Sequence, residues 1–258
     1  MSSLLRIHSL AVNTVREAVR SKVLYVLLFF ALVLIGTGVL LSTLSYVERE
    51  RILQDVGLAA IRLFGAAIAI FVGVGLVHKE VDRRTIFTVL SKPVSRTEFL
   101  LGKFAGLAAT LWIQVAVMAA CFCAVSWLAG APLSAGHAKA LLLVAGELGL
   151  LCAVATLFSS FTTPTLASLF GAGIYLIGHL TRDLRQLGAQ SGSAAAEQAT
   201  ALLHRVLPDL EAFNLTIEAV HGLPIAAAEV WQPLLYAACY SAGLLLVASL
   251  VFERRDFR

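Results

Sequence analysis

Long uncharged stretches alternate with short charged ones along this chain. Six stretches are apolar enough to be interpreted as membrane-spanning helices, which need about 20 residues to cross the hydrocarbon core. They cover residues 23–45, 58–77, 104–128, 140–158, 165–180 and 231–252. The pattern therefore predicts an all-α polytopic membrane protein with six transmembrane helices, in a single transmembrane domain over residues 1–258.

The stretch before the first span, residues 2–22, has a helical period. Leu4, Ile7 and Ala11 fall on one face, and Arg6 and Arg16 fall on the other. This pattern favours an interfacial helix on the cytoplasmic surface that leads into the first span. The alternative is a frayed basic N-terminus.

Between the second and third spans lies a long charged connection, residues 78–103, which we call the coupling loop. Its sequence is HKEVDRRTIFTVLSKPVSRTEFLLGK. We expect a short cytoplasmic helix near residues 82–90, ended by Pro93, and a cap for the following helix at Ser95 or Thr97.

The expected short helix of the coupling loop carries Ile86, Phe87 and Leu90. Large apolar side chains that are exposed on a cytoplasmic helix indicate a binding partner. The alternative is that this helix packs on the ends of the protein's own spans.

Residues 181–229 are predicted to form an extracytoplasmic loop. Within it, residues 191–199 are small and polar, so we expect them to be flexible or weakly helical. Residues 207–220 mix apolar and polar side chains and are expected to fold against the outer face of the membrane.

Composition agrees with a membrane protein, since 59% of the residues are hydrophobic and only 14% are charged. A soluble domain of this size cannot bury so many apolar side chains. A soluble enzyme, a nucleic-acid-binding domain and a disordered chain are therefore excluded.

Charge predicts the orientation in the membrane. Thirteen Lys and Arg residues lie in the N-terminal segment, the coupling loop and the C-terminal tail, against six in the loops of the other side. Cytoplasmic loops of membrane proteins are enriched in Lys and Arg, so both termini are expected in the cytoplasm.

Two charges, Arg62 and Glu147, fall inside predicted spans, about four and seven residues from the outer ends. A charge in lipid is unfavourable by several kcal/mol unless it is paired or hydrated. The two residues are expected to pair, or to line one polar cavity in the outer half of the membrane. The alternative for Arg62 is that its side chain reaches the outer interface.

A Gly-x-x-x-Gly pattern, Gly102 and Gly106, opens the third span. Glycines at this spacing allow two helices to approach closely.

The sequence shows no motif for catalysis. It lacks the Gly-x-x-x-x-Gly-Lys-Ser/Thr pattern of a P-loop, and its six histidines show no pair at chelating spacing. Its four cysteines all lie in apolar runs, where cysteine acts as a small hydrophobe. The chain is therefore not expected to be an enzyme or to hold a metal or cofactor.

At this point the sequence resembles the permease subunits of ABC-2 type transporters. NTVREAVRSKVLYVLLFF is similar to the family's helix leading into the first span, and EVDRRTIFTVLSKPVSRTEFLLGK to its cytoplasmic loop. LPDLEAFN is similar to a segment before the last span, and FERRDF to the cytoplasmic end.

This resemblance implies a cytoplasmic ABC ATPase that docks under the coupling loop and holds the ATP and Mg. It also implies a second permease chain, identical or related, in a bacterial cytoplasmic (inner) membrane. The positions that the resemblance assigns to ATPase coupling are Glu80, Arg83, Arg84, Thr85, Ile86, Phe87, Leu90, Pro93, Arg96 and Lys103. Among these, Ile86, Phe87 and Leu90 would be the apolar anchor.

The expected function is thus that of an exporter permease driven by a separate ATPase. The alternative is a non-transporting membrane anchor or assembly component of an ATPase-driven complex. Partner dependence separates the two, because an anchor would bind the ATPase but move no substrate.

Overall fold

The computed structural model describes residues 3–43, 48–82, 95–190 and 193–253, and within these ranges it consists of helices with no strand. An all-helical chain is expected in a bilayer, because every backbone polar group must find a partner inside its own segment. The helices are α1 (Ser3–Val19), α2 (Lys22–Ser42), α3 (Arg49–Asp82), α5 (Arg96–Leu128), α6 (Ala135–Ser159), α7 (Pro164–Gln190), α8 (Ala194–Val206), η1 (Glu211–Phe213), α9 (Thr216–Val220) and α10 (Ala227–Glu253).

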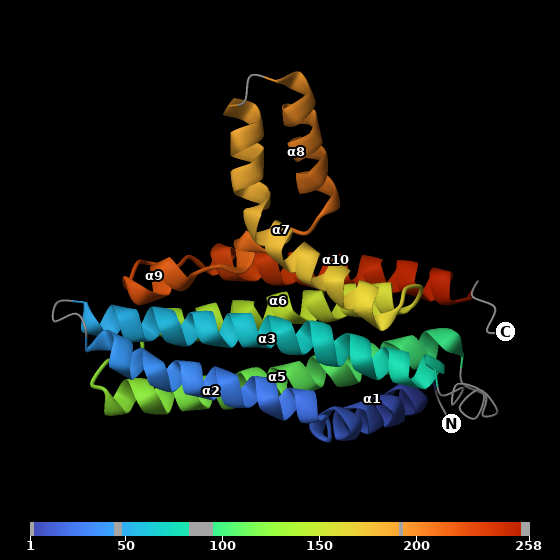
Figure 1. Ribbon diagram of the computed structural model, residues 1–258, viewed down its shortest axis with the longest axis horizontal. Coiled ribbons are helices and arrows are strands. Elements are labelled where there is room, and N and C mark those ends of the chain that lie inside the picture. Colours follow the sequence, from blue (N-terminus) through green and yellow to red (C-terminus); the bar gives the residue numbers. More distant parts are fainter. Residues whose placement is uncertain (1–2, 44–47, 83–94, 191–192, 254–258) are drawn as a thin grey trace.

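Five helices in the described part of the chain are long and apolar enough to cross a membrane, namely α2, α3, α5, α6 and α10. They run along one common axis as a bundle (Figure 1). The expected span over residues 165–180 is not among them. It forms the first part of α7, which continues into the polar residues Arg182, Asp183 and Arg185.

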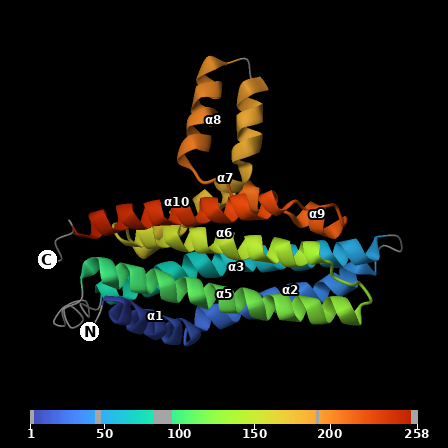
Figure 2. The same ribbon diagram turned by 180° about the vertical axis from the view of Figure 1, so that it is seen from behind.

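Helix α1 starts and helix α10 ends at the same end of the bundle (Figures 1 and 2). Helix α7 starts at that end and leaves the bundle partway along it. The segment from η1 to α9 then brings the chain to the opposite end, where α10 begins. Five long helices therefore still leave both termini on one side.

Helices α3 and α6 form the centre of the bundle. In each of them, 61% of the most apolar 18-residue stretch is buried inside the protein, against 22% of the corresponding stretch in α2 and α10. The outer helices instead point apolar side chains outward, for example Phe29 and Phe30 on α2 and Leu246 and Leu250 on α10. Apolar side chains that face outward along a whole bundle fit a lipid environment.

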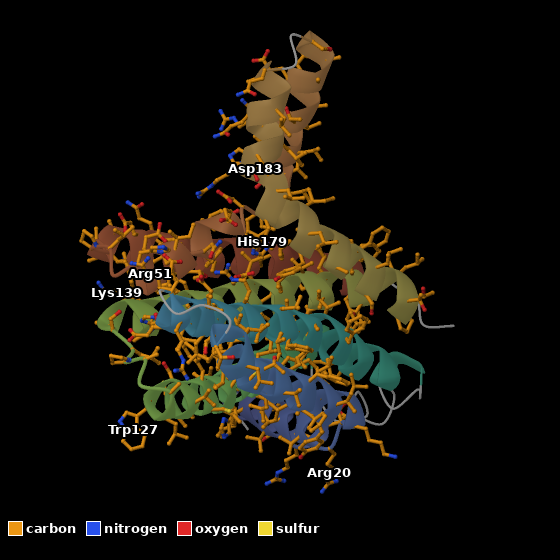
Figure 3. The ribbon with its side chains drawn as sticks, turned by 60° about the vertical axis from the view of Figure 1, so that its left-hand side comes forward. Arg20, Arg51, Trp127, Lys139, His179 and Asp183 are labelled. Atoms are coloured by element: carbon orange, nitrogen blue, oxygen red, sulfur yellow. The ribbon has the colours of Figure 1, made fainter. Side chains whose placement is uncertain are left out.

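Side chains mark the end of the bundle opposite to the termini. Arg51 at the start of α3, Trp127 at the end of α5 and Lys139 at the start of α6 lie there (Figure 3). Trp127 is 79% exposed. Exposed tryptophans favour the membrane–water interface, so this end fits the membrane boundary.

Residues 181–229 form more regular structure than the sequence suggested. Helix α7 continues to Gln190, and the stretch expected to be flexible or weakly helical contributes to α8. The two helices pack against each other as a hairpin that projects from the bundle (Figures 1 and 2). The reason is composition, because alanine is the strongest helix former and α8 opens with three alanines.

The segment after α8, residues 207–220, folds back onto the bundle, and its position at the outer face of the membrane stays a prediction. Leu210 and Phe213 are fully buried, and the Leu210 amide donates to the Gly178 carbonyl of α7 at 3.1 Å. Arg182 on α7 also forms an ion pair with Asp209 at 2.8 Å. These contacts hold the base of the α7–α8 hairpin against residues 207–220, which we call the outer segment.

Replacing Phe213 with alanine tests whether this segment is part of the core. The loss of a fully buried phenylalanine should lower the free energy of unfolding by about 3–5 kcal/mol, because it leaves a cavity against α6 and Tyr236. Chemical unfolding in detergent micelles measures the change.

The matched control is Ile217→Ala on the neighbouring α9, where the side chain is 63% exposed. It should change the free energy of unfolding by about 0.5 kcal/mol or less. Equal effects of the two substitutions would show that residues 207–220 do not pack on the bundle as described.

Candidate functional site

The residues assigned to ATPase coupling fall mostly at a gap in the structure. Arg83, Arg84, Thr85, Ile86, Phe87, Leu90 and Pro93, with the helix expected near residues 82–90, lie outside the described residues. Glu80 belongs to α3 and Arg96 to α5, but their side chains are not described. Lys103 is the coupling position whose side chain can be placed.

Helix α5 is capped at Ser95, one of the two candidates predicted from the sequence. The Ser95 hydroxyl accepts from the Glu98 amide at 3.1 Å, and the Glu98 carboxylate accepts from the Ser95 amide at 3.0 Å. This reciprocal capping box satisfies the free amides at the start of α5. The cap therefore fixes the point at which α5 begins.

The same carboxylate ties α1 to the start of α5. Glu98 Oε1 accepts from the Ser3 hydroxyl at 2.5 Å and from Arg6 Nη2 at 2.9 Å. One side chain thus links the cap of α5 to two residues of the first helix. A hydrogen bond between charged groups is stronger than one between neutral groups.

A second ion pair, Lys103 with Glu17, joins α5 to α1. Lys103 Nζ lies 3.4 Å from Glu17 Oε2, and the Lys103 side chain is only 2% exposed. Its ammonium also lies 6.0 Å from the centre of the Phe99 ring. In this conformation Lys103 therefore contacts α1 and is covered by protein.

Gly102 and Gly106 explain why α1 and α5 come so close. A Cβ atom at Gly102 would meet Leu10 Cβ at 2.6 Å, and one at Gly106 would meet the Ala11 carbonyl oxygen at 2.6 Å. Both glycines therefore face α1, and the Gly-x-x-x-Gly pattern brings this helix against α5.

Helix α1 follows α5 instead of crossing it. Its residues meet α5 in step, with Arg6 at Glu98, Leu10 at Gly102 and Ala11 at Gly106. The expected N-terminal helix is thus present, from Ser3 to Val19, and one of its faces packs on protein. Its position at the membrane interface stays a prediction.

The two intramembrane charges are brought together. Arg62 Nε lies 3.3 Å from Glu147 Oε2, with side chains that are 12% and 0% exposed. Arg62 Nη2 also donates to the Phe213 carbonyl of η1 at 3.1 Å. The Arg62 side chain therefore points into the bundle and not to the outer interface.

Both charges also lie deeper in their helices than the sequence indicated. Arg62 is the fourteenth residue of α3 and Glu147 the thirteenth of α6, because both helices begin earlier than the apolar stretches. At 1.5 Å per residue, each lies about 20 Å from the start of its helix.

A third titratable residue joins this pair, and the sequence did not indicate it. His179 Nε2 lies 3.3 Å from Glu147 Oε1, and His179 Nδ1 contacts the Tyr175 carbonyl at 2.9 Å. In the sequence His179 is one of six histidines that show no pair at chelating spacing. Its position at the end of an apolar run gave no sign that α7 brings it against α6.

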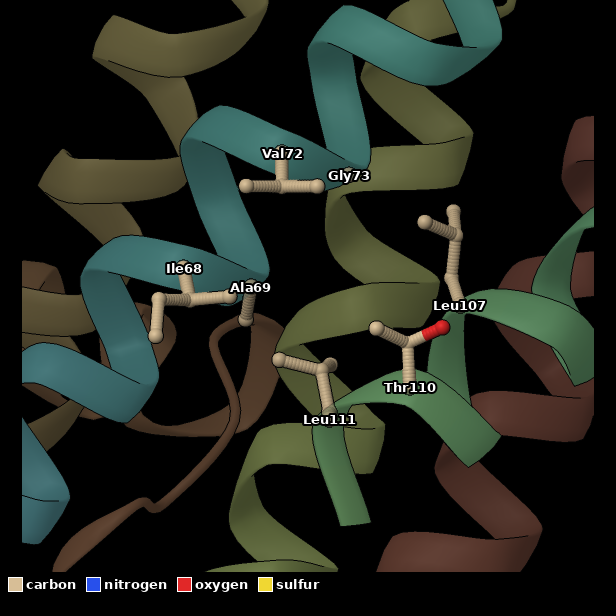
Figure 4. A pocket seen from close by; sticks show the side chains of 7 residues that line it. All are labelled: Ile68, Ala69, Val72, Gly73, Leu107, Thr110 and Leu111. Atoms are coloured by element: carbon tan, nitrogen blue, oxygen red, sulfur yellow. The ribbon is translucent and has the colours of Figure 1, made fainter. Parts of the chain in front are cut away.

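Cavities in the described part of the structure differ greatly in size. The cleft between α3 and α5 is apolar and small, with a volume of about 10 Å³ that suits one water molecule (Figure 4). An open groove of about 660 Å³ lies between the base of α7, η1, α9 and the start of α10. Its rim includes Glu211, Glu218, Glu229 and Arg182.

Among the described residues no group of three or more His, Cys, Asp or Glu side chains is placed to hold a metal ion.

The fold is that of a multi-pass helical membrane protein. Its two longest described helices are α3 and α5, and both contact the N-terminal helix α1. Residues 8–257 match the sequence profile of the family described as "ABC-2 family transporter protein". The chain belongs to this family, and it is therefore a membrane permease of an ABC transporter. A search of curated proteins found no significant match.

A double-mutant cycle on Arg6 and Glu98 tests the link between α1 and α5. The two side chains are 26% and 10% exposed, so the coupling free energy between Arg6→Ala and Glu98→Ala should be larger than that of a more exposed ion pair. Chemical unfolding of the four proteins in micelles gives this value.

The control cycle uses Glu48 and Arg51, an ion pair of the same 2.9 Å length with side chains 54% and 46% exposed. Its coupling free energy should be about 0.3–0.5 kcal/mol, as for exposed pairs on a helix. A value for Arg6 and Glu98 no larger than this would mean that the ion pair does not hold α1 on α5.

Proposed function

We propose that this chain is the permease of an exporter, driven by a separate cytoplasmic ABC ATPase that docks at the coupling loop. Two permease chains form one transporter in a bacterial cytoplasmic membrane, with both termini in the cytoplasm. The partner ATPase binds ATP and Mg, in keeping with a permease sequence that has no P-loop pattern.

The observation that carries this proposal is the length of α3 and α5. They contain 34 and 33 residues, so each is about 50 Å long, against about 30 Å for the hydrocarbon core. The end of α3 at Asp82 and the start of α5 at Arg96 both belong to the coupling loop, residues 78–103. Helices longer than the hydrocarbon core extend beyond it. A cytoplasmic partner could therefore bind their ends and move them as rigid bodies.

The contact between α1 and α5 supports the transmission of force from such a partner. A push on the coupling loop reaches the Ser95–Glu98 cap, and Glu98 passes it to Ser3 and Arg6 on α1. Helix α1 leads directly into α2, with only Arg20 and Ser21 between them. A displaced loop would therefore move α1, α2 and α5 as one unit.

The orientation rests on charge. The start of α1, the end of α3, the start of α5 and the end of α10 lie at one end of the bundle (Figure 1), and the sequence segments that adjoin them carry most of the Lys and Arg residues. The positive-inside rule assigns this end to the cytoplasm. The groove beside η1, α9 and α10 then opens toward the outside.

The internal cavity supports a transporter of two permease chains. The cleft between α3 and α5 has room for about one water molecule and cannot hold a substrate. A substrate path between two copies of the bundle avoids this restriction.

Substitution of Phe87 tests the docking of the ATPase. Phe87→Asp should abolish co-purification of the permease with its ATPase, because it places a charge in the apolar anchor of the coupling loop. Phe87→Leu should retain co-purification. Membrane insertion, measured by fractionation, should be the same for both variants.

A matched control at the opposite end of the bundle is Ile217→Asp, where the side chain is 63% exposed. This variant should co-purify with the ATPase as the unchanged protein does. Undiminished co-purification of Phe87→Asp would rule out docking at this position, whereas ATPase binding without any substrate movement would favour the anchor.

A further inference from the structure

Three helices bring titratable groups to one buried point at the base of the α7–α8 hairpin. Arg62 comes from α3, Glu147 from α6 and His179 from α7. His179 lies between the bundle and the hairpin, with Asp183 further out on the hairpin (Figure 3). The Glu147 side chain is fully buried, whereas that of His179 is 19% exposed.

The contacts of His179 determine where its ring hydrogen lies. Nδ1 is 2.9 Å from the Tyr175 carbonyl oxygen, which can only accept a hydrogen bond. Nδ1 must therefore carry a hydrogen. A neutral imidazole has one N–H, so in the neutral ring Nε2 would present a lone pair toward Glu147 Oε1, 3.3 Å away.

Two acceptors facing each other at this distance repel unless a proton lies between them. We propose that Glu147 and His179 form a proton-binding site, which holds one exchangeable proton on His179 Nε2 or on the Glu147 carboxyl. The site is distinct from the ATPase-coupling region, and the proposal does not depend on ATPase coupling.

Burial supports a bound proton at this point. Among the described atoms, Arg62 Nε, both carboxylate oxygens of Glu147 and His179 Nε2 are buried without a hydrogen-bond partner. An ionised carboxylate in such surroundings is unfavourable unless it is neutralised. Arg62 neutralises the Glu147 carboxylate only in part, because Arg62 Nη2 donates its hydrogen bond to the Phe213 carbonyl oxygen instead.

Other charged and titratable groups near the site are Tyr175 on α7, Glu211 on η1 and Asp209 in the preceding loop. Asp209 is paired with Arg182, and Glu211 Oε1 accepts from the Asn214 side chain. Asp209 Oδ1 and Arg62 Nε are buried without a hydrogen-bond partner as well, but among the described residues of this cluster only Glu147 and His179 face each other with two such titratable atoms, 3.3 Å apart.

Release of the proton would loosen α7 from α6. The repulsion between Nε2 and Oε1 would act next to Gly178, whose carbonyl accepts from the Leu210 amide of the outer segment. The protonation state of the pair would therefore reach the segment of residues 207–220, which borders the open groove.

Two spectroscopic probes of the purified full-length permease in nanodiscs test this site. Nitrogen NMR with ¹⁵N-labelled histidine reports which ring nitrogens of His179 carry hydrogen, with His179→Gln to assign the signal. Infrared difference spectra between pH values report a protonated carboxyl group, with Glu147→Gln to assign the band.

At about pH 6 we expect hydrogen on Nδ1 together with one further proton, seen either on Nε2 or as the carboxyl band of Glu147. Over the range from about pH 5 to pH 9, Glu147→Gln should move the midpoint of the His179 signal by about one pH unit or more. The control His221→Gln should leave both signals unchanged. His221 makes the same contact with the carbonyl four residues earlier, at 3.0 Å, but is exposed.

A bare Nδ1 in the unchanged protein would overturn the proposal, as would a bare Nε2 beside an ionised Glu147 at about pH 6. An unshifted midpoint in Glu147→Gln would also overturn it. If that variant does not fold, the two readings on the unchanged protein still decide the question. Because the ATPase is absent, failure here is separate from failure of ATPase docking.

Discussion

The burial of the Glu147 carboxylate constrains how the centre of the bundle is assembled. Its side chain is fully buried in α6, one of the two helices that form the core. A charge in such surroundings requires partners, and these come from α3 and α7 as Arg62 and His179. Arg62 in turn needs an acceptor, which is the Phe213 carbonyl. The position of the outer segment thus follows from the neutralisation of one carboxylate.

A second polar cluster, Ser3, Arg6, Ser95 and Glu98, holds the other end of the structure. Helix α3 leads from the first cluster toward this end, since Arg62 lies in its middle and its last residue, Asp82, belongs to the coupling loop. From Arg62 to Asp82 the helix rises by about 30 Å. In the proposed function, a movement of the coupling loop is carried along α3 to the Arg62–Glu147 pair and along α5 to α1. This transmission of movement passes through packed helices and therefore does not require a cavity inside one chain.

The sequence contained enough to predict the helical class, five of the long helices and a cap at Ser95 or Thr97, of which the structure has Ser95. These depend on local composition and on short patterns that the tertiary contacts did not override. It was less informative about α7 and α8. The apolar run that ends at Leu180 suggested a helix end, yet the chain continues helically through Arg182 and Asp183. The continuation is stabilised by packing against α8, which no local pattern shows.

Contacts between distant residues were the hardest to predict. Gly102 and Gly106 indicated a close helix contact, but not that the partner would be α1. Arg62 and Glu147 stood out because a charge within an apolar run is unusual. A histidine at the edge of such a run is ordinary, so His179 gained significance only when α7 was seen against α6. The identity of a polar residue's partner depends on the packing of whole helices.

Hydrogen–deuterium exchange of the permease–ATPase complex in nanodiscs tests the central claim most directly, which is that ATP binding acts on this chain through the end formed by α1, α3 and α5. A non-hydrolysable ATP analogue should change amide exchange in α1 and in the first turns of α5 together. The permease alone should show no response to the analogue. Nucleotide-dependent changes confined to the ATPase, with α1 and α5 unaffected, would contradict the account.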